Sequence, residues 1–166
     1  MMLKIAILSL ALAFFSANCL ADDSTYVEYV FDGDTVNIHQ LSSEYKLRLS
    51  DIDAPEKNQP VGKKARRALI NLCMNQPISV QLLGTDQYNR QLGHLQCNQI
   101  DAGLYLVKNG WAWYSAKYSN DKEIMQAEKT ARLNKLGLWK NKNPVPPWIW
   151  RKQHPYTNPT RNSRFN

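Results

Sequence analysis

The chain has 166 residues, of which 43% are apolar and 21% are charged, enough apolar sequence for the core of a single domain. The formal net charge of +7 and the isoelectric point near 9.4 argue against an acidic or a membrane-spanning partner. They favour a polyanionic partner such as nucleic acid, with solubility alone as the alternative.

The first 21 residues have the layout of a secretory signal peptide. Residues 1–4 are a short basic start, Ile5 to Phe15 is an apolar run, and the small residue Ala21 ends the segment. The apolar run is too short for a comfortable transmembrane helix. We therefore expect export to the periplasm or the medium, cleavage after Ala21 and no stable membrane insertion afterwards. Lipid attachment at Cys19 is the alternative, but Asn18 precedes it where a small residue would be expected.

Residues 22–142 are expected to form the folded domain, which begins with three short strands. Alternating polarity predicts these strands at Tyr26 to Phe31, Thr35 to His39 and Tyr45 to Leu49. An Asp-Gly turn connects the first two as a hairpin. Period two places Arg48 on the face opposite Leu47 and Leu49, where an arginine needs an anion or a carboxylate as its partner.

A helix is predicted over Gly62 to Met74, followed by two more strands. The inward positions of the helix are Ala65, Leu69 and Leu72. Its outward positions are basic: Lys63, Lys64, Arg66 and Arg67. A fourth strand begins after Pro77, with Ile78, Val80 and Leu82 on one face, and a fifth runs from Leu92 to Cys97.

The last predicted helix begins at the N-cap Asn120, with Glu123 at the third helical position, and stops at Gly137. Residues 143–166 then form a Pro/Trp-rich basic tail. We expect its tryptophans to pack back onto the domain and the residues beyond Pro155 to be disordered. Five strands, one helix after the third strand and two helices at the end predict an α+β fold that suits a small closed barrel.

Export would leave two cysteines, Cys73 and Cys97, in an oxidising compartment. A disulfide between them would close a loop of about 25 residues and stabilise the fold by roughly 3 to 4 kcal/mol. We favour this bond over the alternative of two small buried thiols. No Cys/His cluster has the spacing of a zinc site.

Three turns carry the residues that suggest chemistry. They are Asp32 to Thr35, Arg48 to Glu56, and Asp86 to Arg90. The carboxylates of Asp34, Asp53 and Glu56 offer hard oxygen ligands for a divalent cation. Planar donor forks for a phosphate come from Arg48 and Arg90. A metal, carboxylates and paired arginines together suggest phosphodiester hydrolysis.

Most of these residues also have a purely structural interpretation. Asp34 suits an Asp-Gly turn, and Asp53 before Ala54-Pro55 suits an Asx turn. Arg90 has a possible ion-pair partner in Asp86. Tyrosines near these turns are as consistent with aromatic side chains at a barrel edge as with stacking on a base.

The order and spacing of the motifs resemble the thermonuclease, or staphylococcal-nuclease-like, family. The matching features are the DGDT turn, the R-x-x-x-x-D-x-P-E stretch, D-x-Y-x-R, the Leu106-Val107-x-x-Gly110 helix end and the closing Gly137-Leu138-Trp139. They cover the chain from Tyr26 to Trp139. The resemblance implies a five-stranded OB-fold β-barrel with three helices.

By this resemblance, Asp34, Asp53 and the main-chain carbonyl of Ala54 bind Ca²⁺, with water filling the remaining positions. Ala54 stands where the family often has threonine, but only the carbonyl is needed. The implied catalytic residues are Arg48, Glu56 and Arg90: Glu56 as the general base, the arginines as donors to the phosphate.

The implied substrate-binding residues are Tyr88, which matches a residue that contacts the substrate phosphate, and Tyr118, which matches one of two family tyrosines. Ala116 stands at the position of the second tyrosine, with Tyr114 and Trp113 as the candidates to replace it.

The resemblance implies a monomeric, calcium-dependent nuclease that acts on DNA, RNA or both and leaves 3′-phosphate ends. The alternative is a non-catalytic OB-fold nucleic-acid-binding module, as in degenerate members of the superfamily. Loss of Glu56 or of either arginine would indicate that module, and all three residues are present. A secreted inhibitor or structural protein would explain neither the paired arginines nor the charge.

Overall fold

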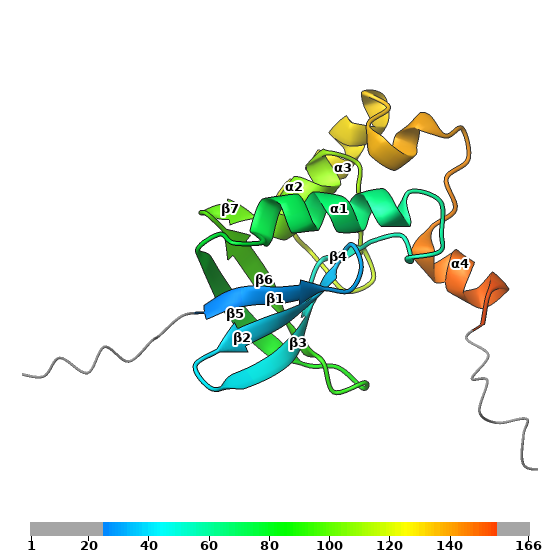
Figure 1. Cartoon of the computed structure of the whole chain (residues 1–166). Coiled ribbons are helices and arrows are strands. Elements are labelled where there is room, and N and C mark those ends of the chain that lie inside the picture. Colours follow the sequence, from blue (N-terminus) through cyan, green and yellow to red (C-terminus); the bar gives the residue numbers. More distant parts are fainter. Residues whose placement is uncertain (1–24, 156–166) are drawn as a thin grey trace, which may run out of the picture.

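The computed structural model describes residues 25–155 (Figure 1). The predicted signal peptide and the residues beyond Pro155 lie outside this range, so their predicted properties stay predictions. Within the described residues, no helix has the length and apolar character needed to cross a membrane.

The five predicted strands are all present, and three strands of two residues each accompany them. The longer strands are β1 (Thr25–Val30), β2 (Thr35–Gln40), β3 (Ser43–Leu49), β5 (Ile78–Thr85) and β6 (Gln91–Cys97). The short ones are β4 (Ile52–Asp53), β7 (Ile100–Asp101) and β8 (Trp113–Tyr114). The helices are α1 (Gly62–Cys73), α2 (Ala102–Lys108), α3 (Lys122–Leu133), the 3₁₀ helix η1 (Gly137–Lys140) and α4 (Pro147–Gln153). The α+β fold class is therefore confirmed.

The main sheet has the strand order β1-β2-β3-β6-β5, with β7 paired to β6. The pairs are antiparallel except β3 with β6, which is parallel. Within the described residues no ladder joins β5 to β1, so the sheet is not closed as expected, while the strand order remains consistent with the expected OB-fold. At the end of the edge strand β1, the carbonyl of Val30 accepts a hydrogen bond of 2.8 Å from Arg66 Nε on α1.

The alternation predicted for β3 is confirmed. Leu47 and Leu49 are buried in the main hydrophobic core, and Arg48 points to the other face with its side chain 15% exposed. The β2–β3 register places Thr35 opposite Arg48. This register brings the Asp-Gly turn and Arg48 to the same end of the sheet.

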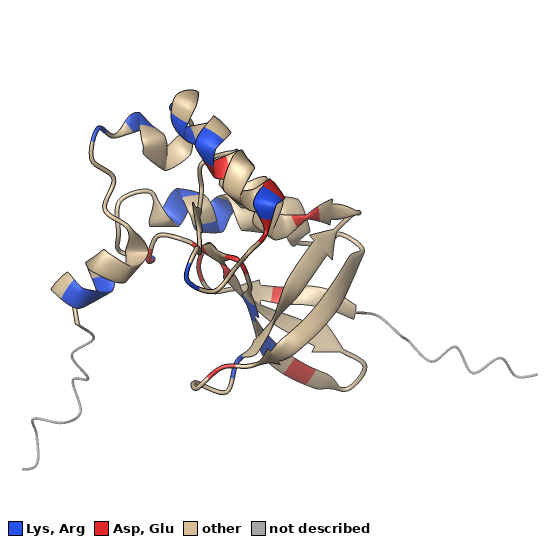
Figure 2. Cartoon of the chain, turned by 180° about the vertical axis from the view of Figure 1, so that it is seen from behind, with Lys and Arg blue, Asp and Glu red and all other residues tan. Residues whose placement is uncertain are grey.

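Helix α1 packs its apolar face on the sheet largely as predicted. Ala65 and Leu69 are fully buried, whereas Leu72 is only half-buried. The predicted outward position of Arg66 is wrong, because its side chain bonds β1 and lies over the ring of Tyr29. The remaining basic residues of α1 are exposed: Lys63, Lys64 and Arg67. Figure 2 shows basic positions along α1 and α4.

Helix α3 begins one residue later than expected. Its N-cap is Asp121 rather than Asn120, because Asp121 Oδ1 accepts hydrogen bonds from the backbone N–H groups of Glu123 at 2.8 Å and Ile124 at 2.9 Å. The helix ends at Leu133. Gly137 is not its C-terminal stop but the first residue of η1.

The region expected to be a tail contains a fourth α-helix, so the prediction of three helices is wrong. Pro147 begins α4, where the missing N–H and fixed φ of proline suit the first helical position. Trp148 packs edge-to-face on Trp113 with ring centroids 5.6 Å apart, which confirms that the tail returns to the domain. Trp150 stacks on His154 at 3.8 Å.

The predicted disulfide joins Cys73, at the end of α1, to Cys97, at the end of β6. Both residues are fully buried in the core. The bond closes a loop with a sequence separation of 24 residues and ties the helix to the sheet.

Removing this bond should destabilise the protein by about 3 kcal/mol, because the unfolded chain regains the entropy of an open loop. Urea unfolding of the Cys73→Ser/Cys97→Ser double variant should show a lower midpoint. Reduction of the parent should reproduce that shift, and an unchanged midpoint in both would contradict the prediction.

Candidate active site

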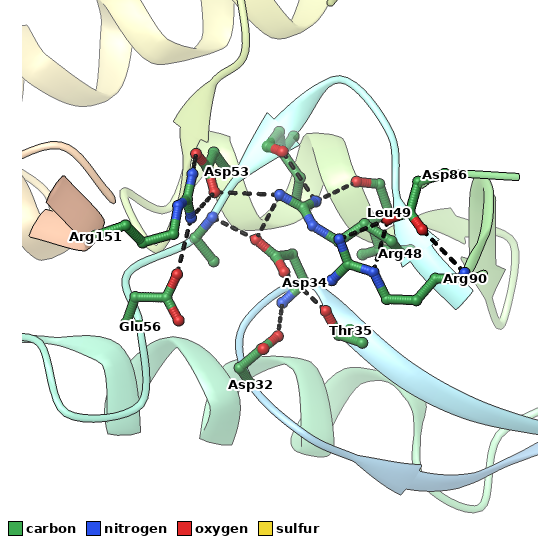
Figure 3. Close-up of polar contacts among 12 residues, drawn as sticks. Asp32, Asp34, Thr35, Arg48, Leu49, Asp53, Glu56, Asp86, Arg90 and Arg151 are labelled. Carbon is green, nitrogen blue, oxygen red and sulfur yellow. Dashed lines mark hydrogen bonds and ion pairs between the residues drawn. The ribbon is translucent and has the colours of Figure 1, made fainter. Parts of the chain in front are cut away.

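The carboxylate of Asp34 is buried at the end of the β1–β2 hairpin. The turn is held by Asp32 Oδ1, which accepts a hydrogen bond of 3.0 Å from the N–H of Asp34. Thr35 Oγ1 donates to Asp34 Oδ1 at 3.1 Å, and the N–H of Ala54 donates to Asp34 Oδ2 at 2.6 Å. The Asp-Gly turn thus connects the hairpin and also positions the buried carboxylate of Asp34 (Figure 3).

Arg48 bridges the carboxylates of Asp34 and Asp53. Its Nη2 lies 3.1 Å from Asp34 Oδ2 and 3.1 Å from Asp53 Oδ1. Its Nη1 donates to the carbonyl of Ile52 at 3.0 Å and to that of Leu49. The partner that the sequence demanded for this arginine is therefore a pair of carboxylates together with main-chain oxygens.

The electrostatic environment of Asp34 is unusual for a carboxyl group. Burial raises its pKa to about 6, and the charge of Asp32 adds to this rise. Arg48 and the hydrogen bond from Ala54 act in the opposite direction but do not cancel the effect of burial. Asp34 therefore needs a further positive charge to be fully ionised at moderately acidic pH.

Asp53 and Glu56 share a partner that the sequence did not suggest, Arg151 of α4. Its Nη2 lies 2.7 Å from Asp53 Oδ2, and its Nη1 donates to Asp53 Oδ1 at 3.2 Å and to Glu56 Oε1 at 2.8 Å. The hydrogen bond to Asp53 is the main cause of the raised pKa of Arg151. The only signal in the sequence was a pair of basic residues beside tryptophans in the tail.

The turn that carries Glu56 is packed against the start of α1. Gln59 Oε1 accepts a hydrogen bond of 3.1 Å from the N–H of Glu56, and the carbonyl of Glu56 accepts one of 2.9 Å from the N–H of Gln59. Gly62 is required here, because a Cβ at this position would overlap the carbonyl of Glu56. The side chain of Glu56 remains 34% exposed and thus accessible to water.

Arg90 forms the predicted structural pair with Asp86. Its Nη2 and Nε lie 2.7 and 2.8 Å from Asp86 Oδ2, while Asp86 Oδ1 accepts from the N–H groups of Tyr88 and Arg90. Although partial burial opposes them, these hydrogen bonds lower the pKa of Asp86. The side chain of Arg90 is 30% exposed and extends toward Arg48 in Figure 3, so pairing does not remove it from the site.

The two predicted substrate-binding tyrosines are on the surface. Tyr88 is 71% and Tyr118 is 76% exposed, and the nearest cations are Arg90 and Lys117, respectively. Trp113, a candidate to replace the missing family tyrosine, is buried among Trp139 and Trp148 and cannot stack on a base.

The predicted cation ligands come together in a way that fits an oxygen-ligated ion. One nitrogen of Arg48 is within 3.1 Å of oxygens from both Asp34 and Asp53, and Ala54 adjoins them through its hydrogen bond to Asp34. Two carboxylates and a carbonyl suit Ca²⁺, which completes its shell with water. Residues 25–155 contain no group of three His, Cys, Asp or Glu side chains placed to hold a metal, so the carbonyl would be an essential ligand.

Comparisons with known proteins match the chain to a family of nucleases. The family model described as staphylococcal nuclease homologue matches residues 46–141, more than half of the chain. A Haemophilus influenzae protein named uncharacterized endonuclease is 35% identical over 153 residues, 90% of this chain and 86% of that protein. An Escherichia coli protein of the same name is 34% identical over 132 residues, 79% of this chain and 86% of that protein.

Plant relatives are longer. The probable staphylococcal-like nuclease CAN2 of Oryza sativa subsp. japonica is 36% identical over 112 residues, 68% of this chain but only 30% of that protein. The chain therefore corresponds to about a third of the plant protein. The family match includes Arg48, Asp53, Glu56 and Arg90 and ends before Arg151.

The raised pKa of Asp34 predicts a pH-dependent stability. Folding favours the protonated form of Asp34. The stability that this group contributes is therefore fully present below pH 3.8 and is lost as the pH rises through about 6. In chelator at pH 7, Asp34→Asn should therefore raise the free energy of unfolding by about 1 to 3 kcal/mol, since a shift of one pKa unit corresponds to about 1.4 kcal/mol.

Urea unfolding at pH 4 and pH 7 tests this, with Glu123→Gln, an exposed carboxylate on α3, as the control for net charge. The gain should be small at the lower pH. A loss of stability at pH 7 would contradict the assignment of burial as the dominant effect.

Proposed function

This chain belongs to the family of staphylococcal nuclease homologues, and we propose that it is a calcium-dependent nuclease that hydrolyses phosphodiester bonds of DNA and possibly RNA. The observation that carries the proposal is the convergence of Asp34, Arg48, Asp53 and Glu56 at one end of the sheet, with Arg90 directed toward them. Relatives named endonuclease and staphylococcal-like nuclease support the nuclease class.

The residues divide the reaction between them. Glu56, which is partly exposed, orients the attacking water and accepts its proton. Arg48 and Arg90 present planar donor forks and stabilise the negative charge that builds up on the phosphate oxygens. The leaving group is the 5′ oxygen, so the products carry 3′-phosphate ends.

The cation would be held by the carboxylates of Asp34 and Asp53 and by the carbonyl of Ala54. When bound there, Ca²⁺ supplies Lewis-acid polarisation of the phosphate. The chain holds both carboxylates in place through Arg48 and holds Asp34 also through the main-chain N–H of Ala54.

The surface next to Glu56 suits a nucleic-acid strand. A hollow there is lined by a set of basic and aromatic side chains: Lys57, Lys63, Lys64 and Trp150. Lysines bind phosphates through charge, and an indole can stack on a base. With a formal net charge of +7, the chain should bind its substrate more weakly as salt rises.

We also propose that the protein is exported and acts as a monomer. The disulfide between Cys73 and Cys97 supports export, since such bonds persist in oxidising compartments. Intact mass of the secreted or periplasmic protein should correspond to a chain that starts at Asp22.

Substitution of Glu56 distinguishes a nuclease from a non-catalytic binding module. Glu56→Gln removes the base but no cation, so the variant should still bind DNA with a steep salt dependence while its cleavage rate falls roughly 10²-fold or more. Zymograms with DNA and RNA, with calcium and with chelator, measure cleavage; Glu123→Gln is the matched control. If Glu56→Gln cleaves at the parental rate, Glu56 is not the general base. If the parent itself does not cleave with calcium present, the protein is a non-catalytic binding module.

Arg90 should matter for turnover rather than for folding. The Asp86 turn keeps its hydrogen bonds to the main-chain N–H groups of Tyr88 and Arg90 when the Arg90 side chain is removed. Arg90→Ala should therefore fold and lose about 10²- to 10³-fold in kcat. The exposed Arg67→Ala on α1 is the control, and full activity of folded Arg90→Ala would exclude a catalytic role.

A further inference from the structure

Helix α4 is anchored beside the carboxylate cluster by contacts that do not involve Arg151. Trp148 packs on Trp113, and Pro147 is buried. Gln59 Nε2 donates to the carbonyl of Val145 at 2.6 Å, just before the helix. Because Gln59 also binds the backbone of Glu56, one buried side chain connects the approach to α4 with the turn of the proposed base.

This anchoring places the guanidinium of Arg151 on the oxygens that the proposed chemistry needs. Both oxygens of Asp53 accept from Arg151, and Asp53 Oδ1 also accepts from Arg48. The same guanidinium reaches Glu56 Oε1 at 2.8 Å. A cation ligand and a general base are thus occupied by one side chain from the segment beyond the family match.

The contact of Arg151 with Asp53 and Glu56 can be replaced by other partners. A divalent ion on Asp53 competes with the guanidinium fork of Arg151. Arg48 and Arg151 already donate three hydrogen bonds to a carboxylate that has about four acceptor sites, and the ion and the guanidinium repel each other. Arg151 is 48% exposed, so water can replace its carboxylate partners at low cost. A displaced guanidinium beside a bound phosphate has an alternative partner of matching geometry.

We propose that Arg151 is a third active-site arginine that holds Asp53 and Glu56 in the ion-free protein and moves to the substrate phosphate when a cation takes Asp53. The inference rests on the proposed function. It has a thermodynamic consequence: Arg151 weakens the binding of calcium alone and strengthens the coupling between calcium and a phosphate ligand. This coupling is reciprocal, since each ligand raises the affinity for the other by the same factor.

The test is calorimetric titration of Ca²⁺, with and without thymidine 3′-monophosphate, which carries the product phosphate and has no phosphodiester bond. Arg151→Gln should bind calcium alone roughly fivefold or more tightly than the parent, within the usual range of coupling between sites. The nucleotide should improve calcium binding clearly in the parent and at least severalfold less in Arg151→Gln.

Lys152→Gln is the matched control, because it removes one positive charge from the adjacent exposed position of the same helix. It should shift calcium affinity by less than about twofold, as expected for a screened surface charge. Arg151→Lys keeps the charge but not the planar fork, so it should retain only part of the coupling. Arg151→Gln that behaves like Lys152→Gln, or that binds calcium more weakly than the parent, would overturn the inference.

Failure of this inference and failure of the proposed function give different results. In one outcome, the parent cleaves DNA with calcium, but Arg151→Gln has the calcium affinity and coupling of the parent. The nuclease proposal then stands, and the role of Arg151 is excluded. In the other outcome, Arg151→Gln binds calcium more tightly and loses the coupling, but the parent cleaves neither DNA nor RNA. The role of Arg151 then stands, and the nuclease proposal is excluded. No calcium binding by any variant overturns the inference.

Discussion

The burial of two carboxylates beside one another is the constraint from which the rest of the site follows. Asp34 is 5% and Asp53 is 6% exposed, and an ionised carboxylate so far from water is costly unless positive charge and hydrogen-bond donors surround it. Arg48 meets part of this need for both, with one nitrogen between them, although burial still raises the pKa of Asp34. The N–H of Ala54 and the hydroxyl of Thr35 supply further donors to Asp34.

Strand register delivers these groups to a common point. Because β2 and β3 pair with Thr35 opposite Arg48, a slip of one residue would exchange Arg48 with a buried leucine and destroy core and site together. The parallel pairing of β3 with β6 sets Arg48 opposite Leu92, two residues after Arg90. The close approach at Gly62 then brings the Glu56 turn onto α1. Positions far apart in the chain are therefore fixed by backbone geometry rather than by the flexible side chains themselves.

Sequence patterns predicted the features that depend on neighbouring residues. The five longer strands, α1 and the disulfide follow from periodicity and cysteine pairing. That Asp34, Asp53 and Arg48 belong to one site came from the family resemblance, whereas the residues alone indicated only that Arg48 needs an anion or a carboxylate as its partner. Features decided by distant contacts were missed. Closure of the barrel depended on pairing between β1 and β5, which are far apart in the chain. The N-cap of α3 was missed for a local reason, because either of two adjacent polar side chains could have reached the free N–H groups. Arg151 lies 98 residues from Asp53, within a Pro/Trp-rich stretch whose composition suggested only a tail.

The charge balance of the cluster is consistent with the proposed exchange of an arginine for an ion. Three carboxylates, those of Asp34, Asp53 and Glu56, contact the two guanidinium groups of Arg48 and Arg151, which leaves the ion-free cluster one negative charge in excess. Exchange of Arg151 for a divalent cation would make the same cluster neutral and would release one positive charge next to it. A phosphodiester carries one negative charge, so the freed guanidinium and the substrate are matched in charge as well as in geometry. A negatively charged substrate can thus approach carboxylates that would otherwise repel it.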